Sequence, residues 1–280
     1  MNLAHFSPLR LSEIPMRCSR RLLLFLLSPL ALLADPRSTE PLALGPGEVM
    51  TFRVGWGIFP SAGEIRIHAE QTPNEPILQV TTTTSTRGFL KNFFPFEARN
   101  VAQFDSSTWL LRRTDEVSES KRKNTKLHLD FDYTANTAAY VNALDPGKSA
   151  ELLMPAGQPM DLITCLVQTR AWDLKPGDQR DALVIFDDDF YELTIHAEGY
   201  EEVHTPLGNF RTLVLVPKME KTEPKGMFKR GSNVKVWISQ DERRLPVRFQ
   251  VEFKFGLGVA TLVDHQPPAA DVAHAPDPHS

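Results

Sequence analysis

The sequence predicts a mainly β protein, in which a curved antiparallel sheet forms an incomplete barrel around one α-helix. Alternation of apolar and polar residues, typical of strands with one buried face, dominates residues 47–265. A single segment, residues 159–177, instead places apolar residues at helical spacing. A strongly curved sheet can bury its apolar face around that helix, whereas a flat sandwich would leave the helix without a partner.

The first 34 residues have the pattern of a secretory signal peptide. Three arginines between residues 17 and 21 precede the apolar run 22–27, and Ala34 supplies a small residue for cleavage. The run is too short for a permanent membrane-spanning helix, which needs about 20 residues. Leu32 departs from the small-residue rule at the cleavage site, so an uncleaved membrane anchor is the alternative. We expect export to the periplasm.

Charge and cysteine content narrow the class of protein further. Residues 1–34 contain four basic residues and one acidic residue, so their removal changes the formal net charge from −4 to −7. This balance argues against nucleic acid as a partner. Cys18 leaves with the signal peptide, which leaves Cys165 without a disulfide partner. No His or Lys lies at helical spacing from Cys165, which favours a buried packing thiol over a reactive one.

Eleven or twelve strands are expected within a single β-rich domain, residues 47–265. Met50, Phe52, Val54 and Trp56 share one face of the first strand. In the clearest strand, PVRFQVEFKF at residues 246–255, Val and Phe alternate with charged and amide residues, so one face is dry and the other is wet. Turn signals join the strands at Asp145–Gly147, Asp187–Asp189, Pro206–Asn209 and Asp241–Glu242.

The flanking segments, residues 35–46 and 266–280, are rich in proline and lack apolar periodicity. They are predicted to be a linker and a tail, both disordered.

The expected helix has clear start and stop signals. Pro159 suits a first helical turn, and Asp161 lies near the positive end of the helix dipole. Lys175–Gly177 contains the Pro and Gly that end it. The spacing predicts about four turns.

Two acidic clusters raise the question of a metal. Asp187–Asp189 with Glu192 lacks the alternation of an EF-hand loop, and a hairpin tip is favoured. His196 and His204, with the glutamates between them, contain zinc-binding residue types. A hairpin turning at Gly199 would place His196 on the wet face, so a surface hairpin rich in charged side chains is favoured over a metal site. No metal, cofactor or catalytic residue is assigned, since HExxH, GxSxG and Walker patterns are absent.

The stretch STRGFLKNFFPFEARN, residues 85–100, concentrates aromatic rings where Gly88 and Pro95 prevent one regular strand. These rings either plug one end of the barrel or form the mouth of an apolar cavity. Trp237 points opposite to Val236 and Ile238, so it lies on the wet face or where both faces are covered. The candidate ligand-binding residues are Trp56, Phe89, Phe93, Phe94, Phe96 and Trp237.

Basic residues concentrate at turns, where they are ordinarily solvated. If several meet at one end of the barrel, they would form a patch for an anionic head group or phosphate. The groups are Arg112–Arg113, Lys121–Lys123 with Lys126, Lys218 with Lys221 and Lys225, Lys229–Arg230, and Arg243–Arg244.

Several motifs resemble the DUF3108 family of exported bacterial proteins. They are Gly47–Glu48, VGWG followed by Gly63, Asp161–Leu162, TPLGNFRTLVLVP, and VKVWISQDERRLPVRFQ, and the resemblance covers about residues 45–264. No activity is established for that family, so the resemblance implies none. The late hairpin pattern is also similar to periplasmic lipoprotein carriers of the LolA/LolB type, which implies an incomplete antiparallel barrel that holds acyl chains. Those carriers have several helices at the barrel mouth, and only one is expected here, which leaves open whether the interior is filled.

Three functions follow from these observations. The first is a non-enzymatic envelope protein that binds an apolar or acyl-bearing ligand, a lipid or lipoprotein, in a half-open barrel. The second is a structural or assembly protein that docks an envelope protein partner through sheet edges and the Phe-rich loop. An envelope hydrolase is the least favoured, because no catalytic motif marks it.

Overall fold

The computed structural model of the protein describes residues 40–225, 228, 234–253 and 256–269, all within one compact unit, Arg37–Ser280. The predicted signal peptide, residues 35–39 of the predicted linker and residues 270–280 of the predicted tail lie outside the described residues. Lys229–Arg230 and Phe255 also lie outside them.

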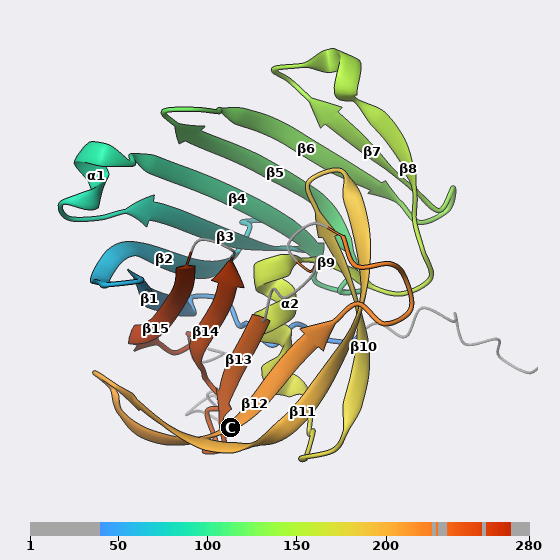
Figure 1. Cartoon of the computed structure of the whole chain (residues 1–280). Helices are drawn as coiled ribbons and strands as arrows, with labels where there is room; N and C mark the ends of the chain where they lie inside the picture. Colours follow the sequence, from blue (N-terminus) through green and yellow to red (C-terminus); the bar gives the residue numbers. More distant parts are fainter. Residues whose placement is uncertain (1–39, 226–227, 229–233, 254–255, 270–280) are drawn as a thin grey trace, which may run out of the picture. The chain divides into compact units, whose positions relative to one another are not determined.

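Fifteen strands in the described residues form one sheet (Figure 1). Its order is β8-β7-β6-β5-β4-β3-β2-β1-β15-β14-β13-β12-β11-β10-β9. Neighbouring strands pair antiparallel, except that β9 pairs parallel to β10. The two edge strands, β8 and β9, do not pair with each other, so the curved sheet does not close. The predicted fold class, an incomplete antiparallel barrel around a helix, is confirmed.

The strands follow the chain in meander order. Those of the first half are β1 (Val49–Trp56), β2 (Phe59–Gln71), β3 (Ile77–Thr86), β4 (Phe96–Asp105), β5 (Leu111–Ser120), β6 (Thr125–Asp132), β7 (Thr137–Asn142) and β8 (Ala150–Leu153). Those of the second half are β9 (Pro159–Asp161), β10 (Gln179–Phe186), β11 (Asp189–Thr205), β12 (Gly208–Lys218), β13 (Val234–Ser239), β14 (Pro246–Phe253) and β15 (Gly256–Gln266).

The expected count of eleven or twelve strands is wrong because the edges of the sheet are short. β8 contains four residues and β9 three, too few for period-two alternation to show in the sequence. In the longer strands the alternation does report burial. Met50 and Phe52 on β1 are fully buried, whereas Arg53 between Phe52 and Val54 is exposed.

The predicted helix of four turns is also wrong in length. α2 spans Leu162–Gln168 and continues as one 3₁₀ turn, η2 (Thr169–Ala171). Its start is displaced because residues 159–161 pair with β10 as β9. Its end is fixed by Arg244, whose guanidinium donates hydrogen bonds to the carbonyl oxygens of Arg170 (2.9 Å) and Trp172 (2.8 Å). These bonds satisfy carbonyl groups that a longer helix would have used.

α2 is not the only helical segment, which corrects the expectation of one helix. A single turn, α1 (Leu90–Phe93), lies in the Phe-rich loop between β3 and β4. A 3₁₀ turn, η1 (Pro146–Lys148), connects β7 to β8 at the predicted turn.

Gly199 does not form the predicted hairpin. β11 continues through it from Asp189 to Thr205 and pairs along its length with β12. The register shifts between Ala197 and Gly199, so the glycine belongs to a bulge that bends a long strand rather than to a turn. The predicted tip at Asp187–Asp189 is confirmed, since Phe186 pairs directly with Asp189 across a two-residue turn.

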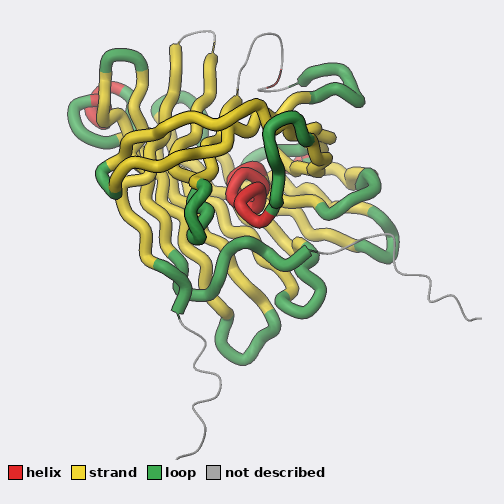
Figure 2. The backbone as a smooth tube through the Cα atoms, turned by 90° about the horizontal axis from the view of Figure 1, so that it is seen from below, coloured by secondary structure: helices red, strands yellow, loops and turns green. Residues whose placement is uncertain are grey.

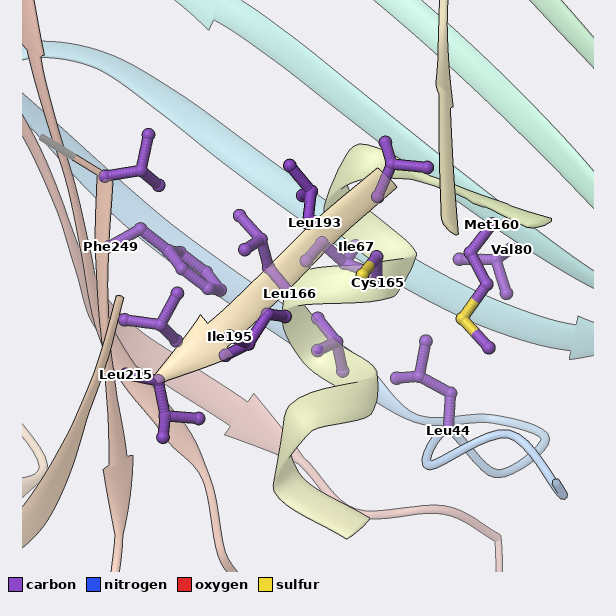
Figure 3. Close-up of a cluster of buried hydrophobic side chains, with 14 of the residues drawn as sticks. Leu44, Ile67, Val80, Met160, Cys165, Leu166, Leu193, Ile195, Leu215 and Phe249 are labelled. Atoms are coloured by element: carbon purple, nitrogen blue, oxygen red, sulfur yellow. The ribbon is translucent and has the colours of Figure 1, made fainter. Parts of the chain in front are cut away.

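α2 lies on the inner side of the curved sheet (Figure 2). Its buried apolar side chains belong to the same hydrophobic core as those of the strands. Side chains from distant parts of the sheet meet there. Figure 3 shows Ile67 on β2 and Leu193 on β11 near Cys165 and Leu166 of α2. Cys165 is buried in this cluster, as its sequence context predicts.

Residues 40–46 pack against the end of α2, which corrects the expectation that this part of the linker is disordered. Leu42 and Leu44 are buried. The buried Gln168 side chain receives a hydrogen bond from the Ala43 amide (2.7 Å) and donates one to the Pro41 carbonyl oxygen (2.9 Å).

A buried carboxylate joins three separate segments of the sequence. Glu48, at the start of β1, is 1% exposed. Its Oε1 atom lies 2.6 Å from Arg170 Nη1 of η2 and 3.0 Å from His265 Nε2 of β15. Its Oε2 atom accepts a hydrogen bond from the Gly45 amide (3.2 Å).

Candidate functional site

An apolar cavity of about 790 Å³ lies between α2 and the inner face of the sheet. Its walls come from β1–β4, the loop containing α1, α2, and β13–β15. Small-molecule sites typically measure roughly 300–1,000 Å³. The interior is therefore not filled by side chains, and its almost wholly apolar lining suits a hydrocarbon group.

One wall of the cavity is the apolar face of α2. Leu162, Ile163 and Leu166 line it. The helix starts at this point because Asp161 caps it: Asp161 Oδ1 accepts hydrogen bonds from the amides of Ile163 and Thr164, both at 3.1 Å. The cap thus fixes which side chains of α2 face the cavity.

The opposite wall is built from the centres of neighbouring strands. Val54 on β1, Ile65 on β2, Val251 on β14 and Ala260 on β15 all line the cavity. Sequence reasoning did not select these residues as site residues. Alternation places them on the inner face, but it does not distinguish an apolar side chain that meets a partner from one that borders open space.

Trp56 lies against two glycines of β15. A Cβ atom on Gly258 would stand 3.2 Å from Trp56 Cζ3, and one on Gly256 would stand 3.2 Å from Trp56 Nε1. Gly256 also has φ +142°, a conformation that favours glycine. These glycines allow the indole to lie close to the backbone at the end of the cavity, where it forms part of the lining.

The Phe-rich loop forms part of the rim. Leu90, Phe94 and Phe96 line the cavity. Phe89 and Phe93 do not, and their rings contact each other with centroids 4.7 Å apart while remaining 67% and 51% exposed. The loop therefore directs some rings to the cavity and leaves others in solvent.

Trp237 is separated from the other five predicted site residues. It is 4% exposed and does not line the cavity. Its Nε1 atom donates a hydrogen bond to Glu201 Oε2 (2.9 Å), and the Arg248 guanidinium lies 5.7 Å from the ring centroid. Of the two alternatives that the sequence left open for Trp237, the structure shows the second: β13 is covered on both faces.

The sequence matches the model of the DUF3108 family, described as a protein of unknown function, over residues 51–263. The chain belongs to the DUF3108 family. None of the curated proteins compared with the sequence matches it. The match covers all the residues that line the cavity, and both α1 and α2.

A solved structure shares this architecture at low sequence identity. A β-barrel-like protein of the domain of unknown function DUF1849 from Brucella abortus is similar with a TM-score of 0.53 and 7% identity, over 81% of this chain and 100% of that chain. At this identity the likeness concerns the fold alone. Two further structures give lower scores, a protein classed as exported with a YmcC-like fold from Bacteroides fragilis (TM-score 0.33, 10% identity, 81% of this chain and 99% of that chain) and one classed as a lipoprotein from Parabacteroides distasonis (0.30, 9%, 81% and 99%).

The basic turns of this DUF3108 protein do not gather into one patch within the described residues. Several of their side chains pair with nearby acids: Lys221 Nζ lies 2.6 Å from Asp181, and Lys225 Nζ lies 2.5 Å from Asp189. The turn Lys121–Lys123 adjoins the Phe-rich loop, where Lys121 Nζ donates a hydrogen bond to the Asn92 carbonyl oxygen (3.1 Å).

The two histidines of the HAEGYEEVH stretch have separate partners. His196 Nε2 lies 3.0 Å from Glu220 Oε2, and His204 Nδ1 lies 2.6 Å from Asn209 Oδ1. Across the described ranges, no group of three or more His, Cys, Asp or Glu is placed to hold a metal ion. The helices in those ranges are all too short or too polar to cross a membrane.

Proposed function

We propose that this DUF3108 protein is an exported cell-envelope protein that binds an apolar or acyl-bearing ligand without catalysing a reaction. The observation that carries the proposal is the apolar cavity of about 790 Å³ between α2 and the sheet. Transfer of hydrocarbon from water into such a space is favourable at about 25 cal/mol per Å² of buried apolar surface. The ligand is a lipid or the acyl part of a lipoprotein, and the periplasm is the compartment.

Fluorescence titration with N-phenyl-1-naphthylamine, a neutral apolar probe, tests this proposal directly. Ala260 is buried and lines the cavity, so Ala260→Phe should fill part of the space and weaken probe binding at least tenfold. Ala139→Phe is the matched control, because Ala139 is exposed on β7 and lies outside the cavity lining. If Ala260→Phe fails to fold, Leu162→Trp provides a second obstruction, because Leu162 on α2 is half-buried and lines the cavity.

Native mass spectrometry of the purified protein supplies an independent measurement. A co-purified lipid that is lost in Ala260→Phe and retained in Ala139→Phe supports the proposal. Unchanged probe affinity in both obstructing variants would reject it, as would failure of the wild-type protein to bind either probe or lipid. Cell fractionation tests the proposed compartment.

A structural or assembly role is the second candidate, because large aromatic side chains remain in solvent. Phe89 and Phe93 are exposed outside the cavity, and the edge strand β8 carries the exposed Leu153. Such features can dock an envelope protein partner. A photo-crosslinking residue at position 89 distinguishes the roles in cells: a single dominant protein adduct favours the assembly role, whereas lipid adducts favour the carrier role.

A further inference from the structure

A second, more polar recess of about 280 Å³ adjoins the apolar cavity. The two spaces share four lining residues, Thr84, Phe96, Leu162 and Ile163. They therefore meet at the first turn of α2, next to the Phe-rich loop. A ligand that fills the apolar cavity can extend its other end into this recess.

Three carboxylates from three separate elements line the recess. Glu116 comes from β5, Asp161 from the start of α2, and Asp187 from the turn between β10 and β11. Burial raises the pKa of Glu116, and the negative charge of Asp187 raises it further. The Thr125 hydroxyl and the positive charge of Lys123 act in the opposite direction without cancelling the shift. Burial also raises the pKa of Asp161. None of the described residues that line the recess is Lys, Arg or His, so its ionisable side chains are all acidic.

One oxygen atom of the deepest of these carboxylates has no hydrogen-bond partner within the described residues. Asp161 is 7% exposed, and its Oδ1 atom is used in capping α2. Within the described residues, no group donates to Asp161 Oδ2 or to the buried Oδ1 of Asn100, which lines the same recess. Against the effect of burial, which raises the pKa of Asp161, the Thr164 side chain hydrogen-bonds to the carboxylate and lowers that pKa. Buried polar atoms are normally paired, so the remaining acceptor capacity at Asp161 Oδ2 and Asn100 Oδ1 can take a donor from outside the chain.

We propose that the recess binds the protonated amine head group of an amphiphile whose hydrocarbon part occupies the apolar cavity. An ammonium group supplies three donors and one positive charge. It matches the acceptors at Asp161 and Asn100 and offsets the repulsion between Glu116 and Asp187. This inference rests on the proposed function, since the cavity must first accept the chain.

Three ligands of equal chain length separate the contribution of the head group to affinity from that of the hydrocarbon chain. We would titrate dodecylammonium, dodecanol and dodecanoate, each below its micellar concentration, by displacement of N-phenyl-1-naphthylamine. Dodecylammonium should bind at least tenfold more tightly than dodecanol, and dodecanoate more weakly than dodecanol. Glu116→Gln and Asp161→Asn should each reduce the ammonium preference severalfold while leaving dodecanol affinity unchanged.

The substitutions are chosen to be compatible with the fold. Asn caps helices as well as Asp does, so Asp161→Asn preserves the start of α2. Asp187 has φ +57°, which Asn also tolerates, and Asp187→Asn on the exposed turn is a third variant. Glu119→Gln is the matched control, because Glu119 lies on the same strand as Glu116 but is exposed and outside the recess.

The outcomes separate the two proposals. If none of the three ligands binds, the cavity function itself fails. If dodecanol binds and dodecylammonium binds no better, the head-group inference is overturned while the cavity function stands. Tightest binding by dodecanoate overturns it as well, and so does an ammonium preference that survives in Glu116→Gln, Asp161→Asn and Asp187→Asn.

Discussion

Glu48→Gln tests whether the buried ion cluster holds the two ends of the domain together. The substitution preserves size but removes the negative charge that faces Arg170 at 2.6 Å and His265 at 3.0 Å. The Glu48 side chain is 1% exposed and that of Arg170 15%, so little water can replace the lost charge. Arg170 keeps its second hydrogen bond, from Nη2 to the Arg243 carbonyl oxygen (3.0 Å).

The expected loss follows from removing one partner of a buried ion pair, which costs about 3–5 kcal/mol. Because Arg170 retains the Arg243 carbonyl and some solvent contact, we expect the lower end, about 3 kcal/mol. For a domain of this size each kcal/mol corresponds to roughly 2–4 °C in Tm, which gives a decrease of about 6–12 °C. Urea denaturation at neutral pH should show a lower midpoint with an unchanged m-value.

Glu64→Gln is the matched control. Arg87 Nη2 lies 2.6 Å from Glu64 Oε1, the same separation as in the buried pair, but these side chains are 54% and 35% exposed. Exposed pairs contribute about 0–1 kcal/mol. Equal losses in Glu48→Gln and Glu64→Gln, both below about 1 kcal/mol, would show that burial does not strengthen the Glu48 cluster.

Three further outcomes follow from the structure. Burial raises the pKa of the Cys165 thiol to about 12. Iodoacetamide at pH 8 should therefore leave Cys165 unmodified in the native protein and label it in urea, as mass spectrometry can establish. Labelling of the native protein would contradict the packing of α2. Gly258→Val should cost about 1–3 kcal/mol in urea denaturation, because the added side chain meets the Trp56 ring, and unchanged stability would show that this contact is not tight. A hydrogen bond from the Ser107 side chain lowers the pKa of Asp105 to about 2, despite opposition from burial, so its contribution to stability is present above pH 3.8 and is lost as pH falls towards 2. Asp105→Asn should flatten that decline in urea titrations at a series of pH values, and an identical slope in both proteins would count against it.

The sequence is most informative where one local pattern determines the structure. Alternation at Val247 and Phe249 predicts a strand with one buried face, and both side chains are buried. Asp161 predicts the start of α2 and caps it. The end of α2 is different, because it depends on Arg244, which lies 74 residues away from Arg170 in the chain. No local pattern carries that information.

The cavity and the recess depend on contacts between distant strands, which the sequence shows only in part. The Phe-rich loop indicates a rim at Phe94 and Phe96, but it does not indicate that Phe89 turns away. Glu116 occupies an inward position of β5 between the buried Thr114 and Ser118. That run of polar residues at inward positions was the available signal for a polar recess, and only the fold shows that Asp161 and Asp187 join it.

The unpaired edges β8 and β9 bear on how the interior can change size. In a closed barrel, strand number and shear fix the radius, and widening it requires breaking a hydrogen-bonded ladder. No ladder joins β8 to β9 here, so a change in the distance between these two edge strands would break no ladder hydrogen bond. If the cavity binds a ligand as proposed, this open arrangement would let the same strands bind ligands of different width.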